Sequence, residues 1–118
     1  NMARAVVPGM RQRGSGKIIN IGARAGLRGA GAMAAYSASK SVVIRLTESL
    51  ADELKGDGIN VNCILPSIID TERNRADMPD ADFSTWVTPA AMAEVVKFLA
   101  SPAADPIHGA ALPVEGLA

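Results

Sequence analysis

Hydrophobic positions along the chain form two patterns, short continuous runs and a recurrence every three or four residues, which predict alternating strands and helices. Short apolar runs bounded by glycine or proline stand at Lys17–Gly22, KIINIG, and at Ile59–Leu65, INVNCIL. Runs of this length rich in isoleucine and valine are typical of buried strands. A third run, GAALPVEG at Gly109–Gly116, contains Pro113 and therefore predicts a short strand or an edge strand.

Helical spacing fills the segments between these runs. From Tyr36 to Lys55, apolar residues return every three or four positions, which predicts the longest helix of the chain. Lys55-Gly56 then supplies a cationic last turn and a stop. The apolar positions of this helix are Val43, Leu46, Leu50 and Leu54.

Two further helices are predicted. Ala3–Met10 has the character of the end of a helix, and Pro8-Gly9 is expected to break it before a polar turn, RQRGSG. Thr88-Pro89 has the pattern of an N-cap followed by proline at the first helical position, and this helix is expected to end near Ser101-Pro102. Its apolar face consists of Met92, Val95, Val96 and Leu99.

The order strand, helix, strand, helix, strand predicts an α/β fold with a parallel sheet. The chain has 118 residues, of which 48% are hydrophobic, so it can bury the core of one domain. The segment between Pro66 and Thr88 is irregular, as expected for an ordered loop or a short helix over a site.

Composition excludes several classes of partner and site. Twelve basic and twelve acidic residues cancel, which argues against binding to nucleic acid or to an anionic membrane. One cysteine, Cys63, and one histidine provide neither an internal disulfide nor a metal cluster. No apolar run has the length of a membrane span. We therefore expect a cytoplasmic protein whose partners are not polyanions.

Candidate chemistry gathers around Tyr36 and Lys40. Ligands of parallel sheets bind beyond the carboxyl ends of the strands, where the start of the longest predicted helix also lies. Residues four apart share a helix face, so the phenol and the ammonium can approach the same ligand, and the ammonium can favour the phenolate needed for acid–base chemistry. Taken alone, the spacing also fits a half-buried tyrosine and a solvated lysine.

The combined motifs resemble the short-chain dehydrogenase/reductase family. YSASK follows a strand that ends in NIG, INVNCILPSIIDT comes next, and GAALPVEG closes the chain, so the resemblance covers essentially all 118 residues. It implies a partial Rossmann-type doubly wound parallel sheet of about three strands with flanking helices. It also implies an oxidoreductase that uses NAD or NADP. Residues 1–118 would form the C-terminal, catalytic half of a single domain that lacks its N-terminal glycine-rich half.

The same resemblance assigns roles to individual residues. Tyr36 is implied as the catalytic acid/base, and Lys40 as the residue that holds the nicotinamide ribose and assists the tyrosine. The stretch PSIIDT is similar to the loop that grips the carboxamide of the cofactor, through Pro66, main-chain groups near Ile69 and the hydroxyl of Thr71. Ser67 stands where the family usually has glycine.

Ala23 departs from the family pattern. Most members carry a serine there, whose hydroxyl polarises the substrate carbonyl. The stretches GARAGLRG and LPSIIDTERNRADMPDADFSTW are similar to dihydropteridine reductase, a branch that lacks this serine and reduces an already electrophilic quinonoid pterin. Another substrate remains open, because AAYSASK and INVNCILPS look more like the general family. Besides Ala23 itself, the candidate substrate residues are Arg24, Arg28 and Trp86.

Two interpretations of function follow. The glycine-rich phosphate turn of the family is absent from the sequence. In the first interpretation, the chain is the catalytic half of an oxidoreductase. In the second, it is a truncated, inactive fragment that folds and self-associates. The first strand would lack a neighbour, and an unpaired parallel edge invites pairing with another chain. In the family, the helix ending at Met10 and the helix over Tyr36–Lys55 also build a subunit interface. Both arguments predict a homo-oligomer.

Overall fold

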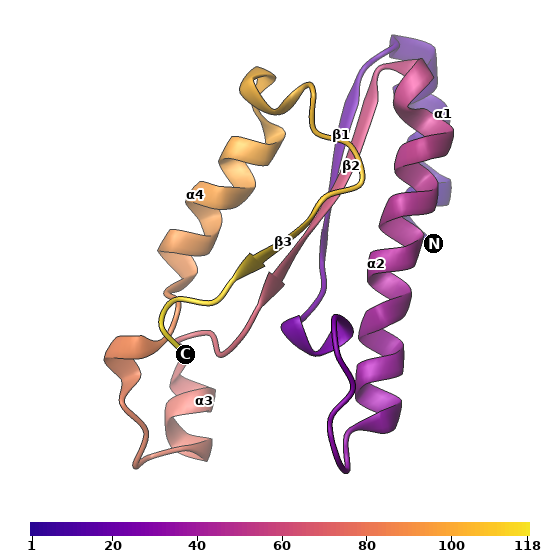
Figure 1. The fold of residues 1–118 in the computed structure, drawn as a ribbon. Coiled ribbons are helices and arrows are strands. Elements are labelled where there is room, and N and C mark those ends of the chain that lie inside the picture. Colours follow the sequence, from indigo (N-terminus) through magenta and orange to yellow (C-terminus); the bar gives the residue numbers. More distant parts are fainter.

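Three parallel strands form one sheet with helices on both of its faces (Figure 1). The computed structural model describes residues 1–118. The strand order is β1-β2-β3, so the predicted parallel α/β architecture is confirmed. The strands are β1, Gly16–Ile21, β2, Ile59–Pro66, and β3, Ala111–Val114. The register aligns Ile18 with Val61 and Cys63 with Ala111.

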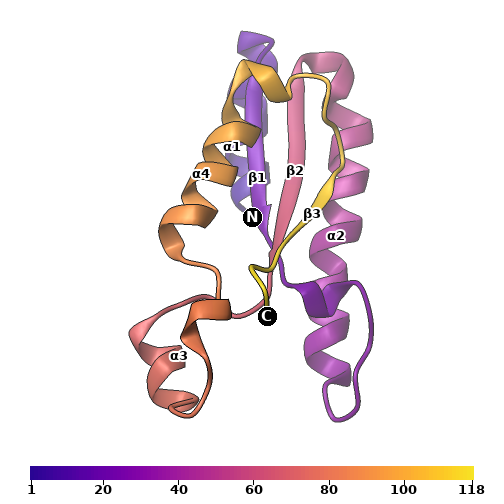
Figure 2. The ribbon, with the colours of Figure 1, turned by 60° about the vertical axis from the view of Figure 1, so that its left-hand side comes forward.

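The helices divide between the two faces of the sheet. Figures 1 and 2 show α1 and α2 on one face and α4 on the other, with the short α3 beyond the carboxyl ends of the strands. The bounds are α1, Met2–Arg13, α2, Ala34–Leu54, α3, Glu72–Asp77, and α4, Pro89–Ala100. Helix α4 has the predicted start, because the Thr88 hydroxyl accepts a hydrogen bond from the N–H of Ala91.

All eight residues of β2 are buried, and their side chains alternate between the two layers. Toward α2, Val61 packs with Ala51 and Leu54, and Leu65 packs with Ile44. Toward α4, Ile64 packs with Leu99 and Ala104. A strand covered on both faces explains why its sequence is a nearly continuous apolar run.

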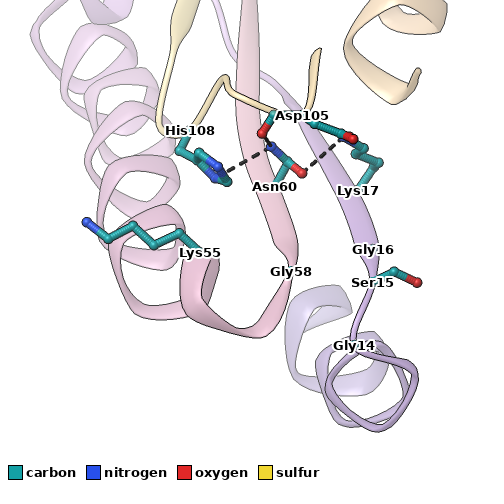
Figure 3. A pocket seen from close by; sticks show the side chains of 9 residues that line it. All are labelled: Gly14, Ser15, Gly16, Lys17, Lys55, Gly58, Asn60, Asp105 and His108. Carbon is teal, nitrogen blue, oxygen red and sulfur yellow. Dashed lines mark hydrogen bonds and ion pairs between the residues drawn. The ribbon is translucent and has the colours of Figure 1, made fainter. Parts of the chain in front are cut away.

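Two buried asparagines on the α4 face of β2, Asn60 and Asn62, fix the return of the chain to β3. Figure 3 shows the first of them, Asn60. The Asn60 amide donates to the carbonyl oxygens of Asp105 and Ile107 at 2.8 and 2.9 Å. Asn62 donates to the Ile107 carbonyl at 2.9 Å and accepts from the Ala110 N–H at 2.8 Å. Lys17 closes the cluster through Asn60 and Asp105, 3.0 Å from the Asn60 oxygen. These side chains pair with one another, so the pocket in Figure 3 is part of the scaffold.

The prediction that Pro8-Gly9 breaks the first helix is wrong for helix α1. The helix continues through Pro8 and Gly9 to Arg13 and ends at Gly14, whose φ of 67° is left-handed, so the first half of the predicted turn RQRGSG is helical. Pro8 lies on the exposed side of the helix, where water can satisfy the carbonyl that loses its partner. Val7 and Met10 pack against the core on the opposite side and hold the helix together.

The longest helix differs from the prediction at its ends. It begins at Ala34, two residues before Tyr36, and is followed by a 3₁₀ turn over Lys55–Asp57. The left-handed residue that ends the turn is Gly58, with φ 75°, and not Gly56. The strand β1 begins and ends one residue earlier than predicted, and β3 is shorter than predicted. As Pro113 indicated, β3 is an edge strand.

We predict that Gly58→Ala lowers the free energy of unfolding by about 3 kcal/mol. The alanine would have to adopt a left-handed backbone conformation, and its Cβ would clash with the main chain. That Cβ would lie 2.2 Å from the Gly14 carbonyl oxygen. Gly56→Ala is the matched control, since a Cβ there meets nothing within 4 Å. Urea unfolding measures both variants, and equal midpoints for the two would contradict this account of the turn.

Candidate active site

The carboxyl ends of the three strands meet at one edge of the sheet, and the start of α2 lies at the same edge (Figure 1). The segment 22–33 leaves this edge after β1, the segment 67–71 leaves it after β2, and the tail 115–118 leaves it after β3. In open parallel sheets this edge is where ligands bind. The sequence-predicted site residues fall on these segments, on the first two turns of α2, on the loop before α4 or, for Pro66, at the end of β2.

Tyr36 and Lys40 occupy adjacent turns at the start of α2 and lie against each other. The Lys40 ammonium is 5.6 Å from the centre of the Tyr36 ring. Tyr36 remains 45% exposed, so its hydroxyl is accessible to a ligand. The ammonium is engaged with no carboxylate of the chain, which leaves its three N–H donors for a ligand and its charge beside the phenol.

The loop after β1 is held tightly against this part of α2. The Ser41 hydroxyl donates to the Gly26 carbonyl at 2.8 Å. A Cβ at Gly26 would lie 2.7 Å from the Lys40 carbonyl oxygen, so glycine is needed for the close approach of the loop and the helix. The backbone that carries Lys40 is therefore held against this loop at Gly26.

Ala23 lies at the junction of β1 with this loop, and its side chain is 8% exposed. Its backbone is extended, and the N–H of the preceding Gly22 donates to the Ile64 carbonyl at 2.9 Å, which anchors the junction to β2. The methyl group carries no donor or acceptor. The side chain at this position therefore cannot form a hydrogen bond to a carbonyl of a bound molecule.

The loop after β2 is rigid. Thr71 caps α3 by accepting from the Asn74 N–H at 3.2 Å, and the Asn74 amide donates to the Ile69 carbonyl at 2.7 Å. The Thr71 hydroxyl proton and the main-chain N–H of Ile69 have no partner within the chain, so both stay available as donors. Pro66 is buried at the end of β2, and the Ser67 hydroxyl donates to the Glu115 carbonyl at 2.9 Å.

A charged and aromatic cluster fixes the segment between α3 and α4. Arg75 donates two hydrogen bonds to the Asp70 carboxylate, at 2.6 and 2.8 Å, and these bonds lower the pKa of Asp70 and raise the pKa of Arg75. The same guanidinium lies 4.8 Å from the Phe83 ring, which packs on Trp86 with ring centres 4.8 Å apart. Sequence reasoning missed the Asp70–Arg75 pair, although the two residues are close in the chain.

The three candidate substrate residues with large side chains have different environments. Trp86 is 6% exposed, so in this structure it is a packing residue, and a role in substrate contact stays a prediction. Arg24 and Arg28 are exposed and line the same hollow in the loop after β1. Sequence reasoning also missed Ser37, whose buried hydroxyl has no hydrogen-bond partner.

Comparison with known sequences identifies the family. The sequence pattern described as short chain dehydrogenase matches residues 1–82. The chain belongs to the short-chain dehydrogenase family. The short-chain dehydrogenase 3-oxoacyl-acyl-carrier-protein reductase FabG of Vibrio harveyi is 36% identical over 123 residues, which cover 98% of this chain and 50% of that protein. Cyclohexanol dehydrogenase of Rhodococcus sp. strain TK6 is 35% identical over 95% of this chain and 46% of its own length.

A solved short-chain dehydrogenase has the same fold over this region. The gluconate 5-dehydrogenase of Burkholderia cenocepacia, whose structure contains NADP and tartrate, matches with a TM-score of 0.86 and 35% identity. The match covers 98% of this chain and 49% of that one. The chain therefore spans about half the length of the relatives it matches. None of its helices is both long and apolar enough to cross a membrane.

We predict that Asp70→Asn lowers Tm at pH 7 and that its difference from the wild type disappears as the pH falls below about 4. The folded-state pKa of Asp70 is lowered by Arg75, so its stabilisation is present above the unfolded-state pKa and is lost in acid. Asp80→Asn is the control, because Asp80 is exposed and unpaired in the segment that follows α3. Thermal melts between pH 7 and pH 2.5 test this, and a pH-independent difference for Asp70→Asn would exclude the ion pair as its cause.

Proposed function

We propose that this chain is the catalytic half of an oxidoreductase that uses NAD or NADP and acts on a small molecule. The observation that carries the proposal is the Tyr36–Lys40 pair, with its ammonium 5.6 Å from the ring centre, at the ligand-binding edge of the sheet. Family membership supports the reaction class. The gluconate 5-dehydrogenase structure, which contains NADP, supports the cofactor class.

The free donors of the site fit a nicotinamide nucleotide. The N–H of Ile69 and the hydroxyl of Thr71 are unpaired donors suited to a carboxamide oxygen, and Pro66 holds the strand end from which they project. The Lys40 ammonium is suited to ribose hydroxyls. The cofactor supplies or accepts the hydride. The residues of this chain orient the cofactor and donate or accept the proton.

The tyrosine and the lysine divide the acid–base work. In the direction of reduction, the Tyr36 hydroxyl gives its proton to the substrate oxygen as hydride reaches the attached carbon. The Lys40 ammonium stabilises the phenolate that remains. In the direction of oxidation, the phenolate accepts the proton of the alcohol. Both steps need the phenol to be accessible, and Tyr36 as a whole residue is 45% exposed.

Ala23 restricts the substrates that this arrangement serves well. With a buried methyl in place of a hydroxyl, the substrate receives no hydrogen bond from this side chain in the transition state. A substrate that is already electrophilic, such as a quinonoid dihydropteridine, needs this bond least. We therefore propose a dihydropteridine reductase-like preference, on the basis of Ala23 and the segment that follows β2.

A second candidate function is an inactive fragment that self-associates. The strand β1 is an edge of the sheet, and Ile21 at its end is 51% exposed. On α2, Val42 and Leu46 are 62% and 51% exposed. Such surfaces favour a homo-oligomer in either interpretation. We place the protein in the cytoplasm, because its only cysteine, Cys63, is a buried free thiol.

Titration of the chain with NADH, followed by nicotinamide fluorescence, tests the proposal. We predict saturable binding that Lys40→Met weakens by about tenfold, the loss of one charge-assisted contact. Lys55→Met is the matched control, because Lys55 lies just past the opposite end of the same helix and pairs with Asp52. Absence of binding at 10 mM NADH, roughly the weakest binding that such titrations resolve, would favour the inactive fragment.

Restoring the family hydroxyl tests the role of Ala23. In a preparation that oxidises NADPH, Ala23→Ser should raise the rate with a simple ketone by about 10²-fold, the value of one such donor, and change the rate with quinonoid dihydropteridine much less. Steady-state kinetics with both substrates gives the ratio, and circular dichroism checks that the added oxygen leaves the fold intact. A wild-type chain that prefers the simple ketone would contradict the pterin proposal.

A further inference from the structure

The loop that follows β1 forms an open hollow of about 660 Å³. Two of its lining side chains are cationic, and none is acidic. The rest of the lining is small or apolar, with Leu27 54% exposed at the rim. The lining residues are Arg24, Ala25, Leu27, Arg28, Gly29, Ala30 and Gly31.

Arg24 is fixed in place from one side only. Its Nη1 donates to the main-chain oxygen of Ala118 at 3.0 Å and lies 3.8 Å from a carboxylate oxygen of Glu115. A guanidinium has five N–H donors in a rigid planar fork. The nitrogens Nε and Nη2 of Arg24 have no partner in the chain, so a bidentate acceptor can still bind there.

Arg28 has no hydrogen-bond or ion-pair partner at all, although it lies in the same hollow as Arg24. Most arginines elsewhere in the chain differ in this respect. Arg11, Arg45, Arg73 and Arg75 each have a carboxylate partner. The two guanidiniums in this hollow have a single carboxylate nearby, that of Glu115 beside Arg24. They therefore favour binding of an added anion, because arginine pairs with carboxylate and phosphate through parallel hydrogen bonds.

We propose that the hollow binds a carboxylate or phosphate group of the substrate, through Arg28 and the free edge of Arg24. This inference rests on the proposed oxidoreductase function and not on the pterin preference, because it makes the hollow the substrate side of the Tyr36–Lys40 site. The loop joins Ala23 to the start of α2, which carries Tyr36, and its turn over Arg24–Gly26 packs against that helix, so the hollow adjoins the same edge of the sheet as the Tyr36–Lys40 pair. Leu27, Ala25 and Ala30 suit an apolar body attached to the anionic group. A quinonoid dihydropteridine ring carries no such group, so the anionic substrate and the pterin are competing assignments.

Titration of the ¹⁵N-labelled chain with inorganic phosphate and with acetate tests the inference. The side-chain Nε–Hε resonances of Arg28 and Arg24 should shift together and saturate in the millimolar range. Arg28→Ala should weaken phosphate binding by about tenfold, and Arg28→Lys by less, because lysine keeps the charge but loses the fork. Raising the salt to about 0.5 M should weaken binding further.

Arg13→Ala is the matched control, because Arg13 is exposed and unpaired at the far end of α1. Arg28 has no partner in the folded chain, so its removal should leave the circular dichroism spectrum and Tm unchanged. Equal binding of phosphate by the wild type, Arg28→Ala and Arg13→Ala would overturn the inference, as would shifts spread evenly over all arginines. The result is independent of NADH binding, so failure of the proposed function and failure of this site can be told apart.

Discussion

The complete burial of β2 is the constraint on which the rest of the structure depends. A parallel strand with no exposed residue needs a layer of helices on each face, and the chain supplies α1 and α2 on one side and α4 on the other. Burying a strand also requires partners for every polar group it carries. Asn60 and Asn62 therefore gather the carbonyls of the loop that leads into β3. The packed sheet then directs three loops to a single edge.

At that edge, rigid parts surround a small number of free donors. The loop before α2 is joined to the helix through Ser41 and Gly26, and the loop after β2 is joined to α3 through Thr71 and Asn74. The groups that remain unpaired include the Lys40 ammonium, the donors of Ile69 and Thr71, the free edge of Arg24 and the guanidinium of Arg28. A site whose framework is satisfied and whose remaining donors face outward is organised in advance for a ligand. The missing hydroxyl at Ala23 and the free arginine are the two features that bear on which ligand it takes.

Much of this framework was predictable from sequence, for reasons that differ between elements. The strand β2 and the helix α2 are recognisable in the sequence because burial imposes an apolar pattern on the chain. The end of α1 was mispredicted because the effect of Pro8 depends on which side of the helix faces water, a tertiary fact. Gly58, and not Gly56, ends the turn because only tertiary contact with Gly14 decides which glycine must be left-handed. The Asp70–Arg75 bridge and the burial of Trp86 depend on how a loop folds on itself, which carries no periodic signal.

Tyr36 is the only tyrosine of the chain, so its ring protons report on the central claim without ambiguity. The measurement that tests it most directly is the nuclear Overhauser effect between the nicotinamide protons of added NAD and the Tyr36 ring. The account predicts cross-peaks to Tyr36 together with contacts to Thr71 and Ile69. Cross-peaks confined to other surfaces of the chain, or none at saturating cofactor, would show that the pair is no catalytic centre in this chain.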